Sequence, residues 1–286
     1  MIAEALSYPF FQRALIAGLL AAVACGIVGT FVVVRGIASI SGGLAHAAFG
    51  GVGLGYLAGF DPILGALGFG LASAVGVGVA EQRLKQGIDT LVAMVWAVGM
   101  AVGIVLIALA PGPEPDLMGY LFGNILFVPV RFLILIACMD LLIGFLVIFL
   151  FRRLEAVAFD EEFATVIGMR VGTLSLLLLA LVALTVVILI RVVGVILVLA
   201  LLTMPAAIAR HWTDALAPMM VVAAGVGAAC ITVGLFFSWM LASMFSADLP
   251  TGPAVILLTA IVYAISAALR HLLSARRPAT REALQD

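Results

Sequence analysis

The chain has 286 residues, of which 65% are hydrophobic and 10% are charged. A soluble domain is typically about 25% charged, so this composition excludes a soluble enzyme and a disordered chain. The three cysteines lie far apart, which excludes a disulfide scaffold. A formal net charge of −1, from 14 basic and 15 acidic residues, provides no basic surface for nucleic acid.

Nine long apolar segments follow one another along the chain. A helix needs about 20 apolar residues to cross a bilayer core of about 30 Å, and continuous apolar runs favour helices over barrel strands. We therefore predict an all-α polytopic bundle of eight to ten spans, forming one integral membrane domain over residues 1–286. The expected spans lie near 11–34, 43–59, 62–80, 90–110, 129–151, 172–190, 192–209, 216–243 and 252–273. The weakest predicted break is at Arg191, and residues 111–128 could contain a short re-entrant helix.

The distribution of basic residues predicts the orientation. With the C-terminus in the cytoplasm, eleven of the 14 basic residues face inside and three lie at or near the outer surface, as the positive-inside rule requires. The three outer residues are Arg13, Arg131 and Arg191. We expect a multi-pass protein of the cytoplasmic membrane whose outer loops are acidic.

The sequence contains no means of binding ATP through a P-loop. That motif requires a glycine-rich loop ending in Gly-Lys-Ser or Gly-Lys-Thr, and the sole lysine, Lys85, follows Leu84. We therefore expect that the chain is not an enzyme and that it binds no cofactor. Any ATP-driven role would need a separate subunit.

The loop over 152–171 has a helical pattern of its own. Its apolar residues follow the spacing of one helix face, and acidic residues occupy the expected first turn, where they suit the helix dipole. Such a helix is suited either to a groove in a soluble partner or to the lipid interface. Gly168 ends the pattern, and Ala164 keeps one flank narrow. The apolar residues are Phe159, Phe163, Val166 and Ile167, and the acidic residues are Asp160, Glu161 and Glu162.

His46 is the histidine predicted to lie inside a span. On a helix Gly42, His46, Gly50 and Gly53 share one face, and glycines there allow close helix packing or leave a groove beside the imidazole. His46 is therefore either a ligand for a divalent metal or a hydrogen-bonded packing residue. Pro205 could kink or break a later span that lines a substrate path. Alternatively, it produces an ordinary proline kink without a role in transport.

Several segments together resemble the membrane permease of the bacterial zinc, manganese and iron ABC importers. They are VVVRGIASISGGLAHAAFGGVGLG, YLFGNIL, FDEEFATVIGMRVG, VVGVILVLALLTMPAAIAR and DLPTGPAVILL, in the family's order. The resemblance implies a type II importer fold and a homodimer with a central metal path. It also implies two ATPase subunits docked on a coupling helix at about 159–169, and an extracytoplasmic metal-binding protein that delivers the ion.

The same resemblance implies roles for particular residues. His46 matches the family's histidine, but Gly42 stands where the family often has an acidic residue four positions earlier. Asp248, in the outer DLPTGP loop, matches an entrance or gate position. The missing carboxylate leaves a second reading open, in which the cargo is a metal chelate such as a siderophore or a corrinoid. A third reading, a transporter driven by an ion gradient, has few protonatable groups in the spans to support it.

Overall fold

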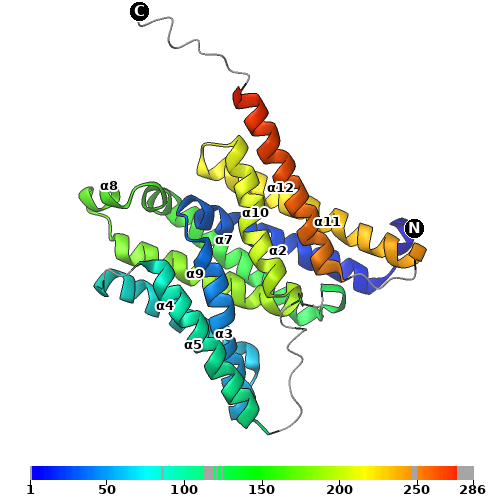
Figure 1. The fold of residues 1–286 in the computed structure, drawn as a ribbon, viewed down its shortest axis with the longest axis horizontal. Coiled ribbons are helices and arrows are strands. Elements are labelled where there is room, and N and C mark those ends of the chain that lie inside the picture. The colour runs from blue at the N-terminus through cyan, green and yellow to red at the C-terminus, as the bar shows by residue number, and fades with distance from the viewer. Residues whose placement is uncertain are drawn as a thin grey trace, which may run out of the picture.

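The computed structural model describes residues 2–84, 87–111, 119, 122–123, 125–245 and 250–275. Within these ranges the chain is helical and contains no strand, and nine helices have 18 residues or more (Figure 1). These nine are α2 (Pro9–Val34), α3 (Ala38–Ala58), α4 (Pro62–Leu84), α5 (Ile88–Leu109), α7 (Val130–Phe159), α9 (Val171–Val193), α10 (Val195–Trp212), α11 (Leu216–Phe245) and α12 (Thr251–Ala275). Three shorter elements are α1 (Ile2–Ala5), η1 (Ile125–Phe127) and α8 (Glu161–Val166).

Eight of the nine long helices are long and apolar enough to cross a membrane. The exception is α3, whose glycines and His46 reduce its hydropathy, although its 21 residues would span a bilayer core. Each of the nine predicted spans corresponds to one of these helices. The predicted all-α polytopic bundle is therefore confirmed.

Two helices form the interior of the bundle, and two groups of helices lie outside them, while α7 packs against the inner pair. The spans of α2 and α9 are 67% and 72% buried, more than those of the other apolar helices. In Figure 1, α3, α4 and α5 form one arm of the molecule, whereas α11 and α12 lie on the far side of α10. Helix α10 contacts α2, α11 and α12 and also touches α3, so it joins the two outer groups.

The break between α9 and α10 falls at Gly194, three residues after the predicted position. Gly194 has φ 87° and ψ 158°, a conformation essentially restricted to glycine, and its backbone lies against that of Phe122 and Gly123. A Cβ at Gly194 would collide with that segment. Arg191 instead lies in the last turn of α9, so the prediction of a break at Arg191 is wrong.

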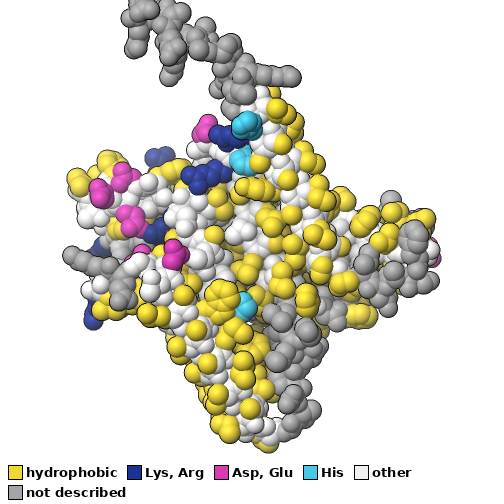
Figure 2. All heavy atoms as spheres, in the orientation of Figure 1, with side chains coloured by type: hydrophobic (Ala, Val, Ile, Leu, Met, Phe, Trp, Pro, Cys, Tyr) yellow, Lys and Arg dark blue, Asp and Glu magenta, His cyan; other side chains and the backbone are white. Residues whose placement is uncertain are grey.

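Charged side chains gather at one end of the bundle. Figure 2 shows most of them around α8 and the neighbouring helix ends, while the rest of the visible surface is largely hydrophobic. Helix α7 runs unbroken past Arg152 and ends at Phe159. The predicted loop over 152–171 therefore consists of the last turns of α7, the short helix α8 and a turn that contains Gly168.

Candidate functional site

Helices α3 and α5 run parallel and very close together because glycines line their contact. A Cβ at Gly99 would lie 2.6 Å from the Ala47 Cα, and one at Gly53 would lie 2.5 Å from the carbonyl oxygen of Gly103. Backbones can approach this closely where no side chain intervenes. The two helices are thereby held in a fixed register, which places Trp96 beside His46.

His46 faces a cavity of about 530 Å³ between α3, α5, α10 and α12. Its imidazole is half-buried and stacks on the Trp96 indole, with ring centroids 4.5 Å apart and planes 5° apart. The walls are largely apolar, and they include Val92, Leu199 and Ile256. The stacking fixes the plane of the imidazole while leaving its ring nitrogens at the edge, where a metal ion could bind them.

The polar groups of the cavity extend from His46 toward the end of the bundle that carries α8. Asp89 lies at the start of α5 and accepts a hydrogen bond from the Ser39 hydroxyl at the start of α3. Ser39 precedes His46 by seven residues, or about 10 Å of helix rise. Thr203 and Met204 of α10 also line the space. The cavity thus offers nitrogen, oxygen and sulfur donors spread along its length.

One chain does not bring these donors together into a complete metal site. Within the described ranges, no group of three or more His, Cys, Asp or Glu side chains could hold a metal ion. The His46 imidazole and the Asp89 carboxylate occupy successive levels of one cavity. In one chain they are therefore separate donors and do not form one coordination sphere.

The structure separates the residues predicted to line the path. Gly42 lines the cavity beside His46. Gly50 instead packs on the Phe69 ring of α4, where a Cβ would lie 2.8 Å from its Cζ, and Gly53 packs on α5. Pro205 is buried within an unbroken α10, and its ring lies toward Gly227 of α11, outside the cavity lining.

Helix α8 presents an apolar surface to the outside. We call Phe159, Phe163, Val166 and Ile167 the α8 patch. Their side chains are 58%, 57%, 84% and 50% exposed. These four residues were predicted to share one face of a single helix. That prediction is wrong, because Phe159 ends α7 and Ile167 follows the last residue of α8, although all four side chains are exposed at the charged end of the bundle. A patch of this kind, rimmed by polar residues, is typical of a protein interface.

The remaining residues of this segment have distinct structural roles. The Asp160 carboxylate caps α8 by accepting a hydrogen bond from the Phe163 amide at 2.8 Å, and Gly168 leaves the helix with φ 82°. Ala164 is fully buried, so it packs inward and takes no part in the exposed surface. Glu161 and Glu162 are both exposed, and Glu161 forms an ion pair with Arg35.

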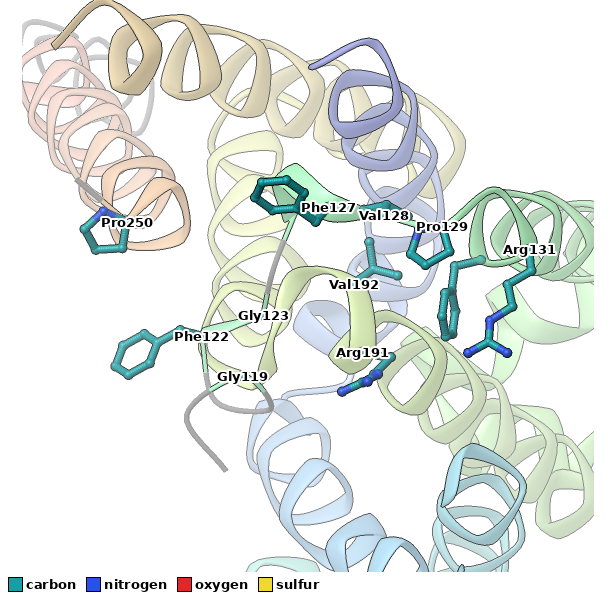
Figure 3. A pocket seen from close by; sticks show the side chains of 11 residues that line it. Gly119, Phe122, Gly123, Phe127, Val128, Pro129, Arg131, Arg191, Val192 and Pro250 are labelled. Atoms are coloured by element: carbon teal, nitrogen blue, oxygen red, sulfur yellow. The ribbon is translucent and has the colours of Figure 1, made fainter. Parts of the chain in front are cut away.

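A second cavity, of about 590 Å³, lies at the opposite end of the bundle. Figure 3 shows Arg131 of α7 and Arg191 of α9 beside it, with Phe127 and Pro129 on its rim. Two guanidinium groups make this space unfavourable for a cation, because like charges repel. The acidic outer mouth predicted from the sequence, including Asp248, lies outside the described residues.

Comparison with known proteins identifies the group to which this chain belongs. The ABC 3 transport family matches residues 7–270. The chain belongs to the ABC 3 transport family. It is 44% identical to an uncharacterized membrane protein of Synechocystis over 94% of this chain and 93% of that protein. It is 32% identical to the manganese transport system membrane protein MntC of Listeria monocytogenes over 91% of each chain.

A solved structure shows the same fold. The chain superimposes on PsaBC from Streptococcus pneumoniae, determined in complex with Fab, with a TM-score of 0.80 and 31% identity over 93% of this chain and 95% of that one. Membership of the ABC 3 transport family confirms the resemblance drawn from the five ordered segments. The matched residues include both the His46 cavity and the α8 patch, so both belong to the ABC 3 region of the chain.

Sequence reasoning missed four residues of the His46 cavity. All four are distant from His46 in the sequence. Trp96 and Asp89 lie in no motif, and Thr203 and Met204 lie in the segment VVGVILVLALLTMPAAIAR, for which only Pro205 had a predicted role. In the sequence Asp89 is an acidic residue at the start of an expected helix, where a carboxylate commonly stabilises the helix through its dipole. One signal was available, because glycines at 99 and 103 mirror those of α3 and indicate close packing of the two helices.

Proposed function

We propose that the chain is the membrane permease of an ATP-driven importer that moves divalent metal ions across the bacterial cytoplasmic membrane. The observation that carries the proposal is the placement of His46 in a cavity within a bundle whose relatives include manganese permeases. Imidazole and carboxylate groups suit manganese, iron and zinc. Manganese is the first candidate because it is the metal that the named relatives transport.

The same cavity supports a homodimer with a central path. It opens on the side of the chain, and one copy contributes a single imidazole. A second copy related by a two-fold axis would close the open side and supply a second His46. Two imidazoles and further oxygen donors would then surround an ion that one chain alone holds weakly.

The α8 patch supports docking of ATPase subunits. The sequence lacks a P-loop, so the energy must come from another chain. The four apolar side chains of the patch would be buried in a groove of that partner, as amphipathic helices are in other complexes. This assignment places α8 and the C-terminus in the cytoplasm, in agreement with the excess of basic residues on that side.

The opposite face would receive the delivery protein. The outer cavity carries Arg131 and Arg191 and is far from α8 along the bundle. An extracytoplasmic metal-binding protein that docks over it would release its ion toward the path between the two permease copies. Asp248 stays a proposed entrance residue of that path.

Gly42 favours a second candidate, a permease for a metal chelate. A glycine there removes a carboxylate from the level of His46 and widens a mostly apolar cavity, and such a space suits a larger ligand.

Uptake by the permease and its ATPase in liposomes distinguishes a permease for free metal ions from a permease for metal chelates. We expect ATP-dependent uptake of free manganese. Uptake of an iron–siderophore chelate without uptake of free manganese, zinc or iron would overturn the proposal.

Gly42→Asp provides a sharper test, because the cavity has room for the new side chain. A Cβ at Gly42 would meet the Leu199 methyl groups at 3.9 Å, an ordinary contact. The added carboxylate would be a hard oxygen ligand one helix turn from His46, so we expect the KM for manganese uptake to fall by about tenfold. The matched control is Gly42→Asn, which has the same shape without the charge. If both variants leave the KM unchanged, the ion does not pass this position.

A further inference from the structure

The half-exposed Glu161 side chain contacts residues outside α8. Its carboxylate forms an ion pair with the Arg35 guanidinium, and the same oxygen, Oε1, accepts a hydrogen bond from the Ser175 hydroxyl of α9 at 3.2 Å. The Arg35 side chain is 13% exposed and the Glu161 side chain 49%. An ion pair that is partly shielded from solvent is stronger than one fully at the surface.

Arg35 lies at the junction of α2 and α3. It is the C-cap of the largely buried α2, and it is followed by Gly36, which has φ 68°. Helix α3 begins at Ala38, so only two residues separate Arg35 from the helix that carries Ser39, Gly42 and His46. A force applied to the Arg35 side chain therefore acts at the start of α3.

Helix α8 has few other attachments to the bundle. It has six residues, it contacts α7 and α9, and its packing residue is the small Ala164. Glu81 of α4 is close enough to interact electrostatically with both members of the Arg35–Glu161 pair. The pair thus lies where α8 meets the α2–α3 junction, α4 and α9.

We infer that the Arg35–Glu161 ion pair transmits displacement of α8 to the start of α3, and thereby couples ATP hydrolysis to the His46 cavity. This inference rests on the proposed function. Glu161 is then a positioning residue that acts inward, while the α8 patch binds the ATPase. The pair needs no direct contact with either the ATPase or the ion.

The experiment measures metal uptake and ATP hydrolysis on the same liposomes, which contain the permease and its ATPase. Arg35→Gln and Glu161→Gln are each expected to reduce manganese uptake per ATP hydrolysed at least fivefold, while ATPase co-purification stays within twofold of wild type. The conservative Glu161→Asp and Arg35→Lys variants keep the charges and should stay within twofold in both measurements. The control Arg153→Gln removes an exposed arginine of α7 and should change neither.

The exchanged variant, with Arg35→Glu and Glu161→Arg together, decides whether the pair itself matters. If the exchanged variant restores at least half of the wild-type uptake per ATP, the inference is supported. This result can be obtained even if the single Gln variants cannot be purified. Single variants with normal uptake per ATP, or an uptake loss that only follows loss of bound ATPase, overturn it. Failure of the wild-type complex to import manganese with ATP would instead contradict the proposed function.

Discussion

Replacing His46 with alanine is expected to lower ATP-dependent manganese uptake at least tenfold and to leave the bound ATPase in place. Stacking on Trp96 holds the imidazole edge-on to the cavity. Among the residues that line the cavity, His46 supplies the side-chain nitrogen that could bind a metal ion. Loss of groups that merely support metal ligands already costs about 10- to 100-fold in affinity. Uptake of radioactive or fluorescently detected manganese into liposomes gives the measurement.

Two variants serve as controls for His46→Ala. His271→Ala removes a histidine from the far end of α12, and it should leave uptake unchanged. Trp96→Phe keeps an aromatic face beside the imidazole and should reduce uptake less than His46→Ala does. If His46→Ala and wild type transport manganese at equal rates, the imidazole is a packing residue and the ion takes another route.

Introducing a charge into the α8 patch is expected to abolish assembly with the ATPase. Val166 is 84% exposed, so Val166→Asp should fold normally, since its carboxylate stays in water in the isolated permease. In the complex that carboxylate would be buried in an apolar groove without a partner, and burial of an unpaired charge is very costly. ATPase co-purification and ATP-dependent uptake should both fall to background.

The control for this prediction is Val166→Thr, which keeps the shape of the side chain and adds an uncharged hydroxyl. It should retain most of the assembly. A melting curve of the isolated permease should be the same for both variants, which distinguishes lost docking from lost folding. An ATPase that co-purifies normally with Val166→Asp would show that α8 lies in the lipid interface instead.

Most of the helices could be predicted because long apolar segments enter the bilayer, where their backbone groups must be hydrogen-bonded internally. Long apolar runs have to become helices in a bilayer, and all nine expected spans correspond to helices. The ends of helices depend on local conformation, and here prediction was weaker. Arg191 resembles a chain break because it is charged, yet the chain turns at Gly194, where the backbone requires a positive φ.

The candidate site could be predicted only in part, because its members meet through packing between distant helices. His46 stood out as an ionisable residue within a glycine-rich span. Asp89 and Trp96 reach the same cavity because Gly99 and Gly103 bring α5 against α3. Likewise, the helical spacing indicated the apolar residues of this segment, but it could not show that they are divided between the end of α7 and α8. Nor could it show that Ala164 faces inward or that Glu161 meets Arg35, 126 residues away.

The most direct test of the account compares liposomes that contain the permease alone with liposomes that contain the permease and its ATPase. Both are loaded with ATP on the side of α8 and given manganese with the delivery protein on the other side. We predict that manganese accumulates against its gradient in the second set and that the first set shows no accumulation. Accumulation of manganese by the permease alone would contradict the account, because the chain would then contain its own source of energy.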